Sequence, residues 1–135
     1  MRTLILAGLL LLGAGCERPS ERGARERELA ARVILEGLTV PGSTVVSYGA
    51  GDEAAEVVLT TGLAPAQVVA WYREAMRLNN WELRQESRAP DGSVTLYAES
   101  RDGRRPLWVR VRPNAGAAGT TYSVIGAEVA RDTLK

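Results

Sequence analysis

The chain has 135 residues, of which 45% are hydrophobic and 24% charged, and its formal net charge is +1. This composition fits one small folded domain, and a net charge so close to zero gives no reason to expect nucleic-acid binding. The sequence contains one cysteine and no histidine. It therefore excludes an internal disulfide, a catalytic triad built on histidine and a metal site of the cysteine–histidine type.

The first sixteen residues, MRTLILAGLLLLGAGC, join one cation, a continuous apolar run and small residues that end at the only cysteine. The apolar run is shorter than the roughly 20 residues that span a bilayer, and it has the length of a secretory signal. The segment Leu12-Gly13-Ala14-Gly15-Cys16 resembles the bacterial lipobox, with its leucine one place early. The resemblance implies cleavage after residue 15, diacylglycerol on the Cys16 thiol and acylation, such as palmitate, of the new amino terminus. The alternative is an ordinary secretory signal with an incidental cysteine.

We expect residues 16–32 to consist of the lipidated cysteine and a flexible tether. The tether is predicted because residues 17–27 are almost all charged residues, Pro, Ser and Gly. Residues 28–36 form either a short helix or an extended lead-in to a single domain at 33–135. Glu17 is not the aspartate that the lipobox resemblance links to inner-membrane retention. The expected location is therefore the bacterial cell envelope, at the periplasmic side of the outer membrane in a diderm host and otherwise at the outer face of the cytoplasmic membrane.

The rest of the chain predicts the element order ββαββββ. Turns rich in Gly, Pro, Asn and Asp separate short runs whose apolar residues alternate. Connections this short favour antiparallel neighbours, so we expect an α+β domain with an antiparallel sheet of five to six strands and one main helix packed on one face. The predicted strands are 43–48, 55–61, 81–88, 94–100, 107–112 and 120–129, and the predicted helix is 63–81.

This part of the chain also resembles a diffuse family of small bacterial lipoproteins. The resemblance covers about residues 40–129 and implies the same fold, but the shared motifs are capping and packing signals that imply no activity. Most members of that family have no assigned function. The motifs are Val40-Pro41-Gly42-Ser43, Pro65 with Val68 and Trp71-Tyr72 in the helix, and Asn80-Trp81 where the family usually has Gly-Trp.

Two groups of side chains are candidate binding surfaces. If the apolar residues of 107–112 face the helix, their neighbours on the other face form an aromatic and cationic surface of the kind found in interfaces. The alternative is that Trp108 lies under arginine stems as a cross-strand contact, or that residues 28–36 cover it. The hairpin arginines could bind phosphate or carboxylate, or could be solvated with Asp102 and Glu99 as local partners. The candidate residues are Tyr97, Trp108, Arg110 and Arg112 on the sheet and Arg104 and Arg105 in the hairpin.

We expect no catalytic residue, metal or cofactor, because the acidic residues are scattered over turns and outward strand positions. The sequence thus predicts a lipid-anchored, non-catalytic binding or accessory module of the cell envelope. Its expected partners are the membrane, through Cys16, and an envelope protein or an anionic envelope component. The alternatives are a cell-wall hydrolase that uses a carboxylate pair and a self-associating structural lipoprotein.

Overall fold

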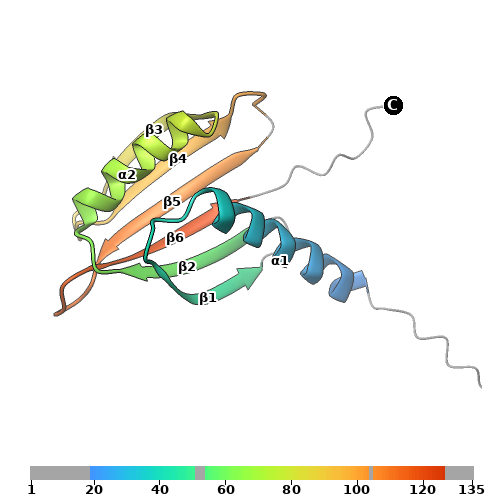
Figure 1. The fold of residues 1–135 in the computed structure, drawn as a ribbon, viewed down its shortest axis with the longest axis horizontal. Helices are drawn as coiled ribbons and strands as arrows, with labels where there is room; N and C mark the ends of the chain where they lie inside the picture. Colours follow the sequence, from blue (N-terminus) through green and yellow to red (C-terminus); the bar gives the residue numbers. More distant parts are fainter. Residues whose placement is uncertain (1–18, 51–53, 104, 127–135) are drawn as a thin grey trace, which may run out of the picture.

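The computed structural model describes residues 19–50, 54–103 and 105–126. Six strands form one antiparallel sheet in the order β1-β2-β6-β5-β4-β3 (Figure 1), so the predicted α+β class and element order are confirmed. The predicted signal, Cys16, Arg104 and the end of the last predicted strand lie outside the described residues. The elements are α1 (Pro19–Gly37), β1 (Thr44–Ala50), β2 (Ala55–Thr61), α2 (Pro65–Leu78), β3 (Trp81–Arg88), β4 (Val94–Ser100), β5 (Pro106–Pro113) and β6 (Thr120–Gly126).

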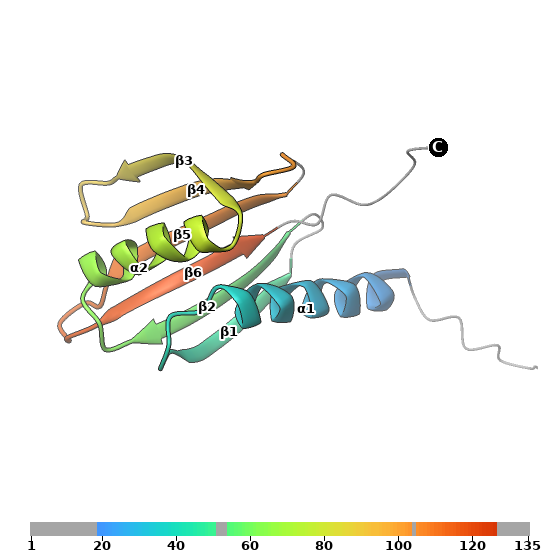
Figure 2. The same ribbon diagram turned by 45° about the horizontal axis from the view of Figure 1, so that its top comes forward.

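Both helices lie on the same face of the sheet, side by side (Figures 1 and 2). The first helix, α1, contacts β1, β2 and β6, whereas α2 contacts β3, β4 and β5. Each helix therefore covers one half of the sheet. The opposite face, which we call the outer face, carries no helix among the described elements.

The core lies between the helices and the inner face of the sheet. Burial alternates along β2, β4 and β6, where every second residue is buried, as expected for strands with one covered face. On β5 the same alternation buries Leu107, Val109 and Val111. The apolar residues of this strand therefore face the helices.

The helix α2 begins and ends as its sequence predicts. Pro65 is its first residue, where a missing N–H is tolerated, and the Ala64 N–H donates to Gln67 Oε1 at 2.9 Å. At the other end Asn79 donates its N–H to the carbonyl groups of the last turn. Asn80 then takes a positive φ of 61°, a conformation that asparagine tolerates better than most residues.

The helix α1 is longer than expected, and the prediction of a flexible tether is wrong for residues 19–32. Glu, Arg, Ala and Leu are good helix formers, and acidic and basic residues recur four apart, as in the Glu28–Arg32 ion pair of 2.9 Å. The last turns pack on the sheet through Ala31 and Ile34. A Cβ atom at Gly126 would collide with Ile34 Cδ1, so glycine lets the helix approach β6.

Candidate functional site

The outer face carries its side chains in rows that run across the strands, because the antiparallel register places outward-pointing residues side by side. The first row crosses five strands and has its apolar members in the middle. It contains Glu56, Ile125, Trp108, Tyr97 and Gln85.

We call Ile125, Trp108 and Tyr97 the aromatic row. The rings of Tyr97 and Trp108 stack with centroids 5.2 Å apart and planes inclined by 29°, and all three side chains are half-buried. Tyr97 Oη donates a hydrogen bond of 2.8 Å to Glu99 Oε1. That hydrogen bond, with some burial and the charge of Glu99, raises the pKa of Tyr97. The aromatic row is thus a fixed, flat apolar strip across three central strands.

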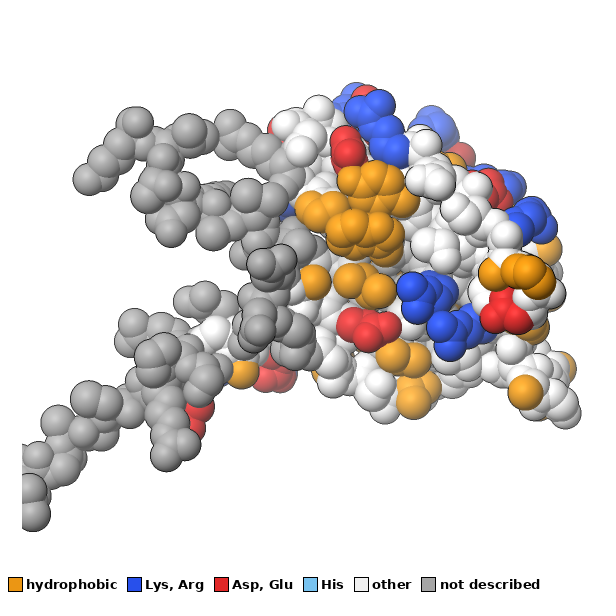
Figure 3. All heavy atoms as spheres, turned by 180° about the vertical axis from the view of Figure 1, so that it is seen from behind, with side chains coloured by type: hydrophobic (Ala, Val, Ile, Leu, Met, Phe, Trp, Pro, Cys, Tyr) orange, Lys and Arg blue, Asp and Glu red, His pale blue; other side chains and the backbone are white. Residues whose placement is uncertain are grey.

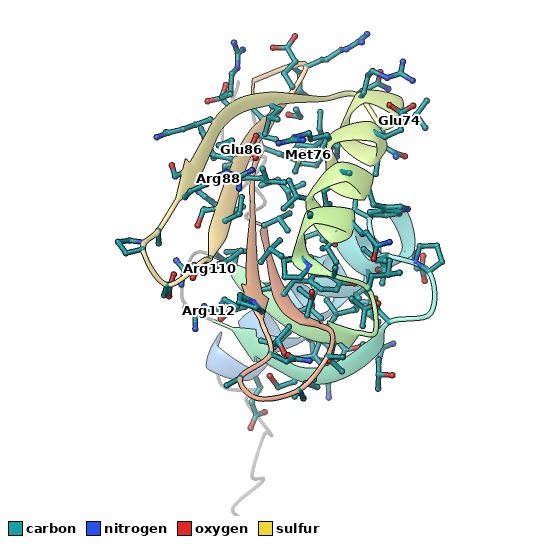
Figure 4. All side chains as sticks on the ribbon, turned by 90° about the vertical axis from the view of Figure 1, so that its left-hand side faces the viewer. Glu74, Met76, Glu86, Arg88, Arg110 and Arg112 are labelled. Carbon is teal, nitrogen blue, oxygen red and sulfur yellow. The ribbon has the colours of Figure 1, made fainter. Side chains whose placement is uncertain are left out.

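Two arginines of β5 lie next to the aromatic row. Arg110 is aligned with Thr95 and Ser123, and Arg112 with Thr121, so each arginine has a hydroxyl-bearing residue beside it. Figure 3 shows hydrophobic side chains gathered on this face with basic side chains beside them, and Figure 4 shows Arg110 and Arg112 on the side of β5 away from α2. The structure therefore brings together four of the predicted site residues.

The two guanidinium groups differ in their surroundings. Arg110 is exposed and has no ion-pair or hydrogen-bond partner among the described residues. Arg112 lies near Asp91, whose pKa is lowered mainly by hydrogen bonds from Ser93 and further by the charge of Arg112. Arg110 is therefore available to a ligand on this face.

Of the two hairpin arginines, only Arg105 lies in the described part of the chain, and it does not extend this surface. The guanidinium of Arg105 lies 5.2 Å from the ring centroid of Trp81, and Trp81 packs against the core on the helix-covered side. Arg105 thus belongs to the inner face, so it lies on a different surface from Trp108. The odd spacing between residues 105 and 108 was the signal for this, since successive strand residues point to opposite faces.

Sequence reasoning missed a pair of acids on the outer face. Glu82 and Glu99 are cross-strand neighbours on β3 and β4, and Arg84 contacts both, at 2.8 Å from Glu82 Oε2 and 3.5 Å from Glu99 Oε2. A register shift between Leu83 and Gln85 places Arg84 beside the two carboxylates. The arrangement is an ion-pair cluster. Among the described residues, no three acids lie together as metal ligands would.

The helix-covered face holds two buried tyrosines. Tyr72 Oη donates to the carbonyl oxygen of Leu38 at 2.7 Å, and Tyr122 Oη donates to Ser43 Oγ at 2.6 Å. Their rings lie 5.7 Å apart, and burial raises the pKa of both. These hydrogen bonds tie α2 and β6 to the segment that follows α1.

Comparisons with known proteins add one finding. Neither a curated protein nor a solved structure matches the chain, and no helix in the described ranges is long and apolar enough to cross a membrane. A family model described as START domain-like matches residues 39–120, a region that holds β1 to β5, α2 and the two β5 arginines. A match to this family suggests a ligand-binding accessory module. Because the match spans more than half of the chain, the protein belongs to the START domain-like family.

Proposed function

We propose that this protein is a non-catalytic binding module, held at a bacterial membrane by lipid on Cys16, that binds an anionic component of the cell envelope on its outer face. One observation carries the proposal. The stacked Tyr97–Trp108 pair lies on the uncovered face of the sheet, and Arg110, two residues after Trp108 on β5, is exposed and has no partner among the described residues.

The chemistry of this face suggests the kind of ligand. A flat strip of aromatic and aliphatic groups favours stacking with a ring or an acyl surface, and a guanidinium binds phosphate or carboxylate with two hydrogen bonds. Hydroxyl groups of Thr95 and Ser123 flank Arg110 and supply weaker donors and acceptors. The best fit is a ligand that joins a flat apolar surface to a phosphate or a carboxylate.

The helix-covered face is a poorer candidate. Tyr72, Tyr122 and Val109 are almost fully buried there, and the hydroxyl groups of the two tyrosines already have partners. A ligand would have to break these hydrogen bonds and separate the helices from the sheet, whereas the outer face needs no rearrangement. This difference supports the outer face as the binding surface.

The binding claim is tested by co-sedimentation of the purified protein with two probes, isolated cell-wall sacculi and vesicles that contain an anionic phospholipid. We expect Trp108→Ala and Arg110→Gln each to weaken binding to one probe by about tenfold, the value of one stacking or charge-assisted contact. Arg32→Gln is the matched control, because it removes an exposed arginine on α1. Equal binding by Arg110→Gln and the unchanged protein to both probes would contradict the proposal.

The anchor is tested separately, by labelling growing bacteria with palmitate. Cys16→Ser removes the only thiol that can form the thioether, so we expect loss of the label and accumulation of the unprocessed chain. The binding assay does not depend on this result, because it uses purified protein. Retained label in Cys16→Ser would show that the lipid is attached at a residue other than Cys16.

A cell-wall hydrolase stays the second candidate because Glu82 and Glu99 are neighbours. Glycosidases use two acids, of which one must be protonated to donate to the leaving group. Here Arg84 contacts both carboxylates, which suits an ion pair better than a proton donor. Release of soluble fragments from sacculi by the protein, and its loss in Glu99→Gln, would favour hydrolysis over binding alone.

A further inference from the structure

The sheet ends in two edge strands, β1 and β3, that differ in chemistry. Each has a neighbour on one side only, so each presents a row of backbone groups that another strand could pair with. On β1 two apolar side chains are largely exposed, Val46 at 61% and Tyr48 at 53%. These belong to the most exposed large apolar residues of the described chain.

The other edge is protected by charge. The eight residues of β3 include Glu82, Arg84, Glu86 and Arg88, which join ion pairs with one another and with neighbouring elements. A further strand added there would have to bury or displace these charges, and charged edge strands are a known protection against such pairing. The seven residues of β1, TVVSYGA, contain no charge.

We propose that β1 pairs antiparallel with β1 of a second copy of this chain, about a twofold axis. A strand laid against Val46 and Tyr48 should itself carry no charge, because a charge placed there would lose its hydration. Only β1 and β6 meet this condition among the six strands, and β6 already has neighbours on both sides. The strand that fits the free edge of β1 is therefore β1 itself, and a twofold axis lets each copy use the same residues.

The local geometry agrees with this occupant. The register of β1 against β2 shifts between Val45 and Ser47, so Val46 has no residue opposite it on β2. Its exposed side chain is thus unused within the subunit and would be buried between two copies. The helix α1 packs over the inner face next to β1, and no described strand lies along the outer edge of β1 (Figure 1).

The size of the contact makes the dimer weak. A strand of seven residues is about 23 Å long, and two such strands bury less than the roughly 800 Å² per partner of a standard interface. We therefore expect copies to associate where they are concentrated, and restriction of the chain to a membrane raises its effective concentration. Pairing through β1 does not itself require the ligand site on the outer face.

Cysteine cross-linking of the full chain in bacteria tests the proposal. Variants with one added cysteine, at position 46, 47, 48 or 49, are compared with Leu78→Cys, a similarly exposed apolar site on α2 at 64%, and with the parent chain, which has Cys16 alone. In a symmetric antiparallel pair only residues near the axis meet their own copy at disulfide distance. We expect the disulfide dimer to peak at one or two β1 positions, at least about tenfold above Leu78→Cys.

A second variant separates specific pairing of β1 from cross-linking by chance encounters between copies. Val46→Lys adds a like charge from each copy at the contact, so it should reduce the cross-link at position 47 to the level of Leu78→Cys. Leu78→Lys is its control and should leave the cross-link unchanged. Cross-linking at β1 no greater than at position 78, or insensitive to Val46→Lys, would overturn the proposal. A cross-link from β1 to a different protein would also overturn it, because the occupant would then be a foreign strand.

Discussion

Trp108 and Val109 are neighbours on β5 whose side chains lie on opposite faces of the sheet, so alanine at each position tests both the register and the binding surface. Val109 is 0% exposed, and loss of a fully buried valine side chain should lower the free energy of unfolding by about 2–3 kcal/mol. Trp108 is half-buried and stacks on Tyr97. Its removal costs part of its apolar burial and the stacking term, about 1–2 kcal/mol in sum.

The assay is urea unfolding followed by far-ultraviolet circular dichroism, because Trp108→Ala removes a fluorophore. A double-mutant cycle with Tyr97→Ala isolates the stacking energy, which we expect to be about 0.5–1.5 kcal/mol. The cycle between Trp108 and Val109 is the internal control, since their side chains share no contact across the sheet and their effects should add.

The opposite pattern would refute this reasoning. If Trp108→Ala cost more than about 3 kcal/mol and Val109→Ala less than about 1 kcal/mol, β5 would be shifted by one residue. A one-residue slip exchanges the two faces of a strand. The aromatic row would then belong to the core, and Arg110 would not lie on an open surface.

Two further predictions concern the β5–β6 turn and the buried tyrosines. Gly119 has a φ of +103°, and a Cβ there would lie 2.5 Å from a backbone oxygen of β2, whereas Gly116 has a φ of +68° with open space around it. We expect Gly119→Ala to lower the unfolding free energy by about 3 kcal/mol or more and Gly116→Ala by about 1–2 kcal/mol; equal losses by thermal unfolding would contradict the close approach. Burial raises the pKa of Tyr72 and Tyr122, so these phenols lose their protons more easily in the unfolded chain than in the folded one. Their contribution to the free energy of unfolding is therefore fully present below pH ~10 and is lost as the pH rises further. Phenolate absorbance of these two tyrosines should appear only with unfolding, and their titration in the folded protein would contradict their burial.

The parts of the fold that local patterns control were predictable from the sequence. The alternation around Tyr97 and Trp108 correctly predicts which residues of β4 and β5 face outward, because the period of a strand is two. Pro65 and the Asn79-Asn80 pair bound α2 for reasons that act within one turn of the helix. Four of the six predicted surface residues therefore lie together as expected.

The parts that depend on distant contacts were not predictable. The placement of β6 between β2 and β5 joins segments some 60 residues apart, and it completes the aromatic row with Ile125. The pairing of Glu82 with Glu99 depends on a register shift that no local motif marks. The helical residues 19–27 were misjudged because composition suggests disorder, whereas the spacing of their charges favours a helix once its end can pack on the sheet.

The extended helix α1 changes how the proposed anchor would present the domain. Only residues 17 and 18 separate Cys16 from Pro19, and the 19 residues of α1 span about 28 Å. Ala31 and Ile34 pack the end of this helix against the inner face, as the position of α1 in Figure 2 shows. A flexible tether over residues 19–32 would let the outer face sample every direction, whereas the helix relates the direction of that face to Pro19, its first residue. Lipid on Cys16 would then hold the domain through the first residue of α1, so the length of this helix would limit how far the aromatic row and Arg110 lie from the bilayer.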